Sequence, residues 1–503
     1  MQDAITATEC LARLVQLTGW SLLKTLWPVV LRIAKLVANF RNSANSPSGI
    51  TPAGASAFEK TLKELLENIG RLIVEWTFNR LELDSRAEMP SILYWEGDAY
   101  RCKRLSPTRN LNCLFGPIRV YRWLYESVDG LGLPALFPLE RCLGIVGRVA
   151  TPALADVVAR LSVDFTQRQV LDALCQQFHV VWGVPTLRHV TQAMAEGIAP
   201  FQHAARVAKI LEWLSQAAGK YGPVRFTLSV GRDGLMLPIR GKNTYKEGAT
   251  ATVSVLDRWG KRLGTIYLGQ MPESGQGTLS DELTRLVQDV LAQWPGATPR
   301  LVYVTDAGFH PRDYFENVLS QMLDPKGTER YLEWEWTVDY YHACGYVSKL
   351  AEAIFGPGRE AHAWAAKMRR WMKDKPGGIH RVLRSAGALR AIRGLVGESK
   401  DYDDACAYLR KHAPWMNYAG SRRRKLPIGS GVTEAACKIV FSQRYKCSGM
   451  KWDIAGGAVI LELRVAVLSR TWTAVRDAMF AAPTPTLTRT NSPIQDQQFA
   501  NAA

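Results

Sequence analysis

Three acidic side chains in this 503-residue chain have positions suited to holding a metal ion: Asp233, Asp306 and Glu434. Asp233 comes just after the apolar run 224–230, and Asp306 directly follows a second apolar run, 301–305. Glu434 lies just inside a helix-like stretch that follows a Gly-Ser-Gly turn. Two aspartates at strand ends and one helical glutamate can converge on divalent cations, as metal-assisted phosphoryl chemistry requires. The positions of these residues therefore predict a metal-dependent phosphoryl-transfer site.

The charge of the chain indicates the kind of substrate that such a site would meet. The 63 Lys and Arg residues outnumber the 46 Asp and Glu residues, which gives a formal net charge of +17. An excess of this size favours a polyanionic partner through phosphate contacts and counterion release. The predicted partner is therefore nucleic acid; a basic protein without a nucleic-acid partner is the alternative.

The cysteines and the early apolar segment indicate a reducing compartment and no membrane partner. The nine cysteines are odd in number and never form a Cys-x-x-Cys pair, so neither a disulfide framework nor zinc is expected. Cys102 and Cys113, the nearest approach to a pair, are interpreted as plain thiols. The apolar segment 14–40 contains three basic residues and a proline, which interrupt any bilayer-spanning window. We expect a cytoplasmic protein.

Strand and helix signals alternate over the second half of the chain. Strand-like runs at 224–230, 251–256 and 264–269 precede a helix at 278–294, a strand at 301–305, a helix from about 311 and a strand at 332–338. This order predicts an α/β fold, a mixed sheet with helices on both faces, and is the order that a ribonuclease-H-like core needs. The expected segments are a first part of the catalytic core at 223–343, a helical insertion at 344–427, and a second part with the acidic helix at 428–475.

The first half is expected to be mostly helical. Residues 1–90 are a predicted helical region, and 91–130 a small basic β module of three short strands that offers Arg119 and Arg122 to DNA. Residues 131–215 resemble helix-turn-helix, with Arg188 and Gln192 on the reading face. A sheet with a charged outer face and a bare helical hairpin remain the alternatives. The tail, 481–503, is expected to be disordered.

Further basic residues surround the acidic helix. Lys438 lies four residues after Glu434 on the same helical face, and Arg444 and Lys446 continue the basic surface. The run Arg422, Arg423 and Arg424 precedes it. These side chains are candidates for binding DNA. The alternative is an ordinary capped helix with a Glu434–Lys438 ion pair.

The stretch 429–452 resembles the end of the catalytic domain in Kra-type insertion-sequence transposases, which are Asp-Asp-Glu transposases with Mutator-like relatives. The resemblance rests on Gly429-Ser430-Gly431 with Glu434, Ala435, Cys437 and Lys438, and on Ser448-Gly449-Met450-Lys451-Trp452. The contexts of Asp233 and Asp306 match the first two acids of that pattern. Asp339-Tyr-Tyr-His342 resembles an Asp-x-x-His motif found before the helical insertion. The likeness is good over 224–472 and weaker over 95–200.

The resemblance implies a role for each of these residues. Asp233, Asp306 and Glu434 would form the metal-binding catalytic triad, and Asp339 and His342 would support the active site. Mg²⁺ would be the metal, with Mn²⁺ able to substitute, and no ATP is expected. The partners would be the terminal inverted repeats of a mobile element and a target DNA, bound by a homodimer or higher oligomer. The location would be the bacterial cytoplasm, at the nucleoid.

The chain departs from the family pattern in one respect, because related proteins often have a cysteine-rich zinc ribbon and here the cysteines lack paired partners. DNA-end recognition would then depend on the basic strands and helices. Two alternatives to a transposase keep the fold. One is a catalytically silent, sequence-specific DNA-binding protein derived from a transposase. The other is a structure-specific DNA nuclease.

Overall fold

The structure is a computed structural model that describes residues 7–45, 49–83, 85–130, 132–241, 244–327, 329–393, 400–481 and 488–489, with side chains assigned from residue 20 onward and not for 488–489. The chain divides into two units, Met1–Met194 with Phe480–Ala503, and Ala195–Met479. Both units contain helices and sheets, and the sheet of the second unit is mixed, so the prediction of an α/β chain is confirmed. The unit boundary falls inside the segment 131–215 that the sequence suggested as one region.

The first unit begins with two long helices, α1 (Ala7–Ser43) and α2 (Pro52–Arg80). Thr51 caps α2, because its hydroxyl accepts a hydrogen bond from the backbone N–H of Gly54 at 3.1 Å, and Pro52 occupies the first turn. The two helices pack along each other, with the rings of Phe40 and Phe58 stacked at 4.4 Å. The expected helical region is therefore present.

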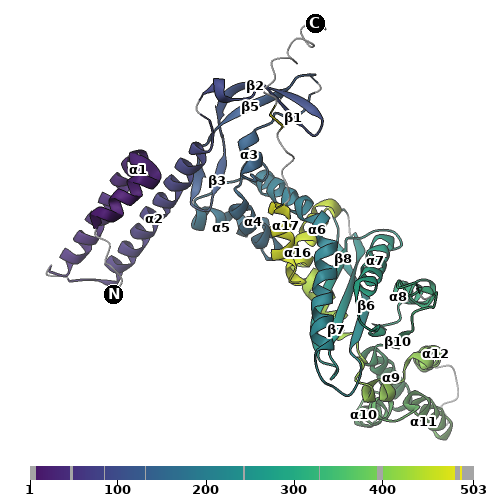
Figure 1. Cartoon of the computed structure of the whole chain (residues 1–503). Helices are drawn as coiled ribbons and strands as arrows, with labels where there is room; N and C mark the ends of the chain where they lie inside the picture. Colours follow the sequence, from purple (N-terminus) through teal and green to yellow (C-terminus); the bar gives the residue numbers. More distant parts are fainter. Residues whose placement is uncertain are drawn as a thin grey trace. The chain divides into compact units, whose positions relative to one another are not determined.

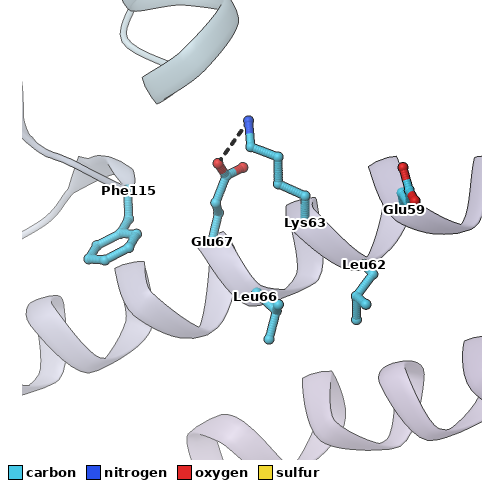
Figure 2. A pocket seen from close by; sticks show the side chains of 6 residues that line it. All are labelled: Glu59, Leu62, Lys63, Leu66, Glu67 and Phe115. Atoms are coloured by element: carbon cyan, nitrogen blue, oxygen red, sulfur yellow. Dashed lines mark ion pairs between the residues drawn. The ribbon is translucent and has the colours of Figure 1, made fainter. Parts of the chain in front are cut away.

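A shallow groove runs along α2, as Figure 2 shows. Leu62 and Leu66 line it together with the ring of Phe115, and the Lys63 ammonium lies 3.2 Å from the Glu67 carboxylate beside it. Leu66 is 52% exposed. The groove shows no arrangement of acids like that expected of the catalytic site.

The predicted β module contains five strands where three were expected. They are β1 (Ile92–Trp95), β2 (Asp98–Pro107), β3 (Leu111–Cys113), β4 (Gly116–Ile118) and β5 (Tyr121–Ser127). Strands β1, β2 and β5 form an antiparallel sheet, and β3 pairs with β4 as a separate hairpin. The three predicted runs are 91–95, 111–116 and 117–125, so the prediction missed β2 and joined β4 to β5, which are separated by only two residues.

One short piece of the tail is ordered into this sheet. Thr488–Arg489 forms β11, which pairs antiparallel with β1 at Leu93 and Tyr94. The prediction of disorder for 481–503 is therefore wrong at these two residues, and α17 also includes residue 481. Residues 482–487 and 490–503 lie outside the described part.

The helical region that follows comprises α3 (Pro138–Cys142), α4 (Pro152–Asp164), α5 (Gln167–Phe178) and α6 (Val184–Ala218). Thr166 and Gln169 form a reciprocal capping box at the start of α5, which fixes where that helix begins. His179 ends α5 in the left-handed conformation at φ 54°. Helix α6, which contains the segment expected to read DNA, is 35 residues long and contains Pro200. It is therefore far longer than the recognition helix of a simple helix-turn-helix motif.

The second unit is built on a five-stranded sheet in the order β10-β9-β6-β7-β8 (Figure 1). Its strands are β6 (Thr227–Pro238), β7 (Tyr245–Leu256), β8 (Arg262–Gln270), β9 (Arg300–Thr305) and β10 (Trp334–Val338). Strands β6, β7 and β8 are successively antiparallel, whereas β9 and β10 run parallel to β6. The mixed sheet predicted for this region is present.

The two faces of this sheet carry different residues. On β6, Leu228 and Val230 point to one face and Ser229 and Gly231 to the other, because side chains alternate along a strand. The apolar face packs against the second half of α6 and against α7 (Gly277–Gln293) in one large core. The opposite face carries small and hydroxyl side chains, and the acidic helix packs on it.

The acidic helix α14 (Gly431–Ala436) continues through a π-helical segment, Cys437–Ser442, into α15 (Gln443–Tyr445). Helix α16 (Ile454–Leu468) packs beside β8, and α17 (Trp472–Ala481) follows it. Phe441 and Leu461 join these helices in a second core.

The predicted helical insertion is present between β10 and α14. It comprises α9 (Tyr340–Phe355), α10 (Arg359–Asp374), α11 (Gly378–Ile392), α12 (Lys400–His412) and α13 (Tyr418–Arg423), and α8 (Phe309–Asn317) precedes it after β9. No strand occurs in 340–427 among its described residues. Trp364 is buried within this helical region, and Trp336 is buried where the region meets the sheet. Both side chains are therefore part of the hydrophobic core.

Candidate active site

The three predicted acids come from three elements of the second unit. Asp233 lies within β6, Asp306 directly follows β9, and Glu434 lies in α14. The expectation that Asp233 ends a strand is wrong, because β6 pairs with β7 as far as Pro238 and Asp233 stands opposite Thr250. Asp306 does lie at the end of its strand.

Asp233 is the most strongly perturbed of the acids. Burial is the main cause that raises the pKa of Asp233 from 3.8 to about 6, and the nearby carboxylates of Asp306 and Glu434 contribute to the same rise. Two hydrogen bonds oppose this shift, since the Gly234 N–H donates to Oδ1 at 2.8 Å and the Cys437 thiol donates to Oδ2 at 3.3 Å. Asp306 and Glu434 are therefore near enough to Asp233 for their charges to affect its pKa.

The acidic helix lies directly on the sheet because the residues between them are small. A Cβ at Gly231 would stand 2.1 Å from the Thr433 hydroxyl oxygen, which leaves room for glycine alone. The Thr433 and Thr252 hydroxyls are 3.0 Å apart, and the Cys437 sulfur is 3.3 Å from the Thr250 hydroxyl. These contacts hold α14 and the π-helical segment over β7 and over β6, the strand that carries Asp233. Burial, and next the Asp233 carboxylate, raise the pKa of the Cys437 thiol to about 12, so it stays a protonated donor.

Asp339 joins the end of the sheet to the start of the acidic helix. Its side chain is fully buried, and Oδ1 accepts the backbone N–H of His342 at 2.5 Å, which caps α9. Oδ2 accepts both the backbone N–H of Ser430 and the Ser430 hydroxyl, the latter at 2.7 Å. The same hydroxyl lies 3.1 Å from Oε1 of Glu434. Because a hydroxyl has one proton, Ser430 can donate to one carboxylate at a time.

His342 does not bond to Asp339 through its imidazole. Its ring lies among aromatic side chains, 5.5 Å from the Tyr346 ring and 5.8 Å from the Tyr408 ring. The Tyr408 hydroxyl donates to the backbone oxygen of Asp306 at 3.1 Å. The helical insertion therefore supports the second acid through Tyr408, and His342 contributes an exposed ring beside this support.

The donor chemistry of the three acids fits a hard divalent cation. The Gly308 N–H donates to Oδ1 of Asp306 at 2.9 Å, and the Ser430 hydroxyl lies near Oε1 of Glu434. The second oxygen of Asp306 and the second oxygen of Glu434 have no hydrogen-bond partner among the described residues. Carboxylate oxygens are the ligands that Mg²⁺ prefers. As they stand, no three His, Cys, Asp or Glu side chains in the described part are grouped closely enough to hold a metal ion.

The predicted DNA-binding residues fall into exposed and buried groups. The exposed ones are Arg119, Arg188, Gln192, Arg422, Arg423, Arg424, Lys438 and Lys446. Arg119 approaches the ring of Tyr121 at 5.4 Å, and Arg188 lies 3.3 Å from the side-chain oxygen of Gln167. Lys438 and Lys446 lie on the helix that carries Glu434 and immediately after it.

Two of the predicted DNA-binding arginines are not on the surface. Arg122 is 8% exposed, pairs with Glu140 at 2.5 Å and lies over the ring of Phe137. Arg444 is 3% exposed and lies over the ring of Trp452. Both predictions are corrected, because a guanidinium enclosed in this way cannot meet a phosphate without breaking its packing.

The basic run at the end of the insertion is distant from the acids. Arg424 pairs with Glu335, near the start of β10, and its backbone oxygen accepts from Arg300, the first residue of β9. Asp306 follows the other end of β9. At about 3.3 Å per residue, the two ends of that strand are roughly 17–20 Å apart. Arg422 forms an ion pair with Asp374.

Several residues of this site were not singled out as functional from the sequence. Ser430 lies four residues before Glu434, and Cys437 three after it, so helical spacing gives a signal for both. Gly231 lies two residues before Asp233, on the same strand face. Tyr408 gives no such signal, because it comes from the helical insertion 102 residues after Asp306.

No family model matches the chain, and no curated protein matches it in sequence. The site must therefore be interpreted from its own geometry. Among the described helices, none is long and apolar enough to cross a membrane.

Proposed function

We propose that this chain is a DNA transposase that cuts the ends of a mobile element and joins them to target DNA. The observation that supports the proposal best is that Asp306 and Glu434 lie near enough to Asp233 for their charges to raise its pKa. In a chain with a net charge of +17, nucleic acid is the phosphoryl substrate that this charge favours.

The strand order also supports the proposal. Three successive antiparallel strands, then two strands parallel to the first, are the arrangement expected of a ribonuclease-H-like core. In that interpretation Asp233 is the acid of the first strand, Asp306 that of the fourth, and Glu434 that of the helix covering both. The helical segment between β10 and α14 corresponds to the insertion.

The three carboxylates would hold Mg²⁺ or Mn²⁺. When bound, two such ions would activate an attacking oxygen and stabilise a leaving oxygen at a DNA phosphate. The protein's own residues set the positions of the acids. Asp339 holds Ser430 at the start of α14, beside the Glu434 carboxylate, while the Cys437 thiol orients one oxygen of Asp233.

A strand-transfer assay tests the proposal. The purified full chain would be mixed with labelled DNA carrying the flanking ends of its own gene and with a supercoiled target, in Mg²⁺ or in EDTA. We expect joined product that requires metal and disappears in Asp233→Asn. Asp281→Asn is the matched control, because Asp281 is an exposed acid on α7, at the other face of the sheet.

The outcomes separate the alternatives. Metal-dependent cleavage without joining would favour a structure-specific nuclease. Site-specific binding without cleavage would favour a silent DNA-binding descendant of a transposase. Joining that survives Asp233→Asn would refute the assignment of the acids.

A further inference from the structure

A cavity of about 580 Å³ lies between the start of α14 and the face of the sheet on which that helix packs. Its wall includes the hydroxyl residues Ser229, Thr252 and Thr433, the apolar side chain of Ile428, and two exposed residues, Tyr341 and Arg262. Its size is within the range of pockets that hold small organic ligands. The role given above to the acids does not use this cavity.

Its position connects it to the acids in two ways. Ser229 lies four residues before Asp233 on the same strand face, roughly 13 Å away along β6. Ser430 also lines the cavity, and its hydroxyl lies 3.1 Å from the Glu434 carboxylate. A ligand in the cavity would therefore be near a phosphate held at the acids.

The chemistry of the lining combines features that suit a nucleobase. Thr252 and Thr433 satisfy each other at 3.0 Å, but the Ser229 hydroxyl has no hydrogen-bond partner among the described residues. A polar base edge could therefore bond to Ser229. Ile428 offers an apolar surface for the faces of a base.

Tyr341 supplies the aromatic surface. It lies in the first turn of α9, and its side chain is 64% exposed. A Cβ at Gly429 would lie 2.9 Å from the Tyr341 ring, so glycine at this position lets the ring approach the backbone of the cavity wall. Exposed aromatic rings stack on unpaired bases with little regard to sequence.

Arg262 supplies a positive charge. It is exposed at the start of β8 and forms no ion pair within the described ranges. A cation at this place suits the phosphate that accompanies a base. We propose that the cavity holds an unstacked nucleotide of a DNA strand whose backbone lies at the acids, with Tyr341 stacked on the base. This inference rests on the proposed function.

Photo-crosslinking tests the proposal without requiring catalysis. The full chain would be irradiated in EDTA with a single-stranded 12-mer of 5-iodo-2′-deoxyuridine, and the adducts mapped by mass spectrometry. We expect an adduct at Tyr341. Tyr341→Phe should retain the adduct at that position, whereas Tyr341→Ala should lose it and bind the strand roughly tenfold more weakly.

Tyr331→Ala is the matched control, because Tyr331 is 61% exposed and does not line the cavity. It should bind normally. A 12-mer of abasic sites should bind equally to the unmodified chain and to Tyr341→Ala, since no base can stack. The melting temperature of each variant would show that it is folded.

Adducts at Phe309 or Tyr331 with none at Tyr341 would overturn the proposal, as would unchanged affinity in Tyr341→Ala. The result can be separated from the proposed function. Asp233→Asn should keep the Tyr341 adduct while losing cleavage. If Asp233→Asn still cuts DNA, the assignment of the acids fails, and the adduct at Tyr341 is judged by its own controls.

Discussion

Replacement of Gly231 by alanine should displace the acidic helix from the sheet. The new Cβ would lie 2.1 Å from the Thr433 hydroxyl oxygen, and 3.1 Å from both the Thr252 hydroxyl and the backbone oxygen of Val304. Ordinary contact begins near 3.4 Å, so the first pair must separate by about 1.3 Å, the difference between these two distances. The Val304 oxygen belongs to a paired strand, so the displacement must fall on the Thr433 side chain and the helix that carries it.

The cost follows from this displacement. Overpacking of a filled interior typically costs about 1–3 kcal/mol, which corresponds to a fall in melting temperature of roughly 2–6 °C for a unit of this size. A shift of about 1 Å between catalytic groups can lower a rate by about 100-fold. We therefore expect Gly231→Ala to lose both stability and metal-dependent cleavage of DNA.

Differential scanning calorimetry and the cleavage assay would measure the two effects. Gly387→Ala, in α11, is the matched control, because a Cβ there meets no atom within 4 Å. This variant should leave the cleavage rate unchanged, and should leave the melting temperature unchanged or raise it slightly. Adding Thr433→Ala to Gly231→Ala removes the closest atom and should restore part of the melting temperature and part of the rate. Wild-type behaviour of Gly231→Ala, or a double variant no better than the single one, would refute the reasoning.

Three further predictions concern the groups around the acids. Because the pKa of Asp233 is raised from 3.8 to about 6, the folded chain binds a proton more tightly than the unfolded chain between these values. The contribution of Asp233 to stability is thus greatest at low pH and falls as the pH rises through 6. Asp233→Asn should remove this dependence on pH and raise the melting temperature above pH 6. Melting temperatures of the two proteins that do not differ across a pH series in EDTA would contradict this prediction. Asp339→Asn places an amide N–H opposite the two Ser430 donors, which should cost about 1–3 kcal/mol in denaturant unfolding, whereas Ser430→Ala should cost about 1 kcal/mol. Equal losses in both variants would argue against Asp339 as the joint between sheet and helix. Cys437→Ala removes a hydrogen-bond donor that lowers the pKa of Asp233. The acid limb of the pH–rate profile should therefore move to higher pH. A move to lower pH would show that the thiol does not donate to this carboxylate.

Local sequence determined much of the second unit. Alternating side chains in β6 and β7 identify two strands with one apolar face, and the apolar run before Asp306 places that acid at the end of a strand. The order of strands and helices and the long helical insertion follow from the same patterns. These features depend on residues close to one another in the chain, so they are visible in the sequence.

The surroundings of the acids depended on the tertiary structure. Strand β6 extends past Asp233 because β7 supplies paired backbone groups as far as Tyr245, and no local pattern announces that pairing. Arg122 and Arg444 resemble surface cations in the sequence, but Glu140 and the ring of Trp452 enclose them.

The joint between Asp339 and Ser430 spans 91 residues of sequence, and that between Cys437 and Asp233 spans 204. A side chain's partner, and with it the pKa and the direction of the side chain, is set by whatever packs against it in space. Composition and spacing therefore identified which residues could perform the chemistry, whereas the packing of α14 against the sheet decided how those residues are held.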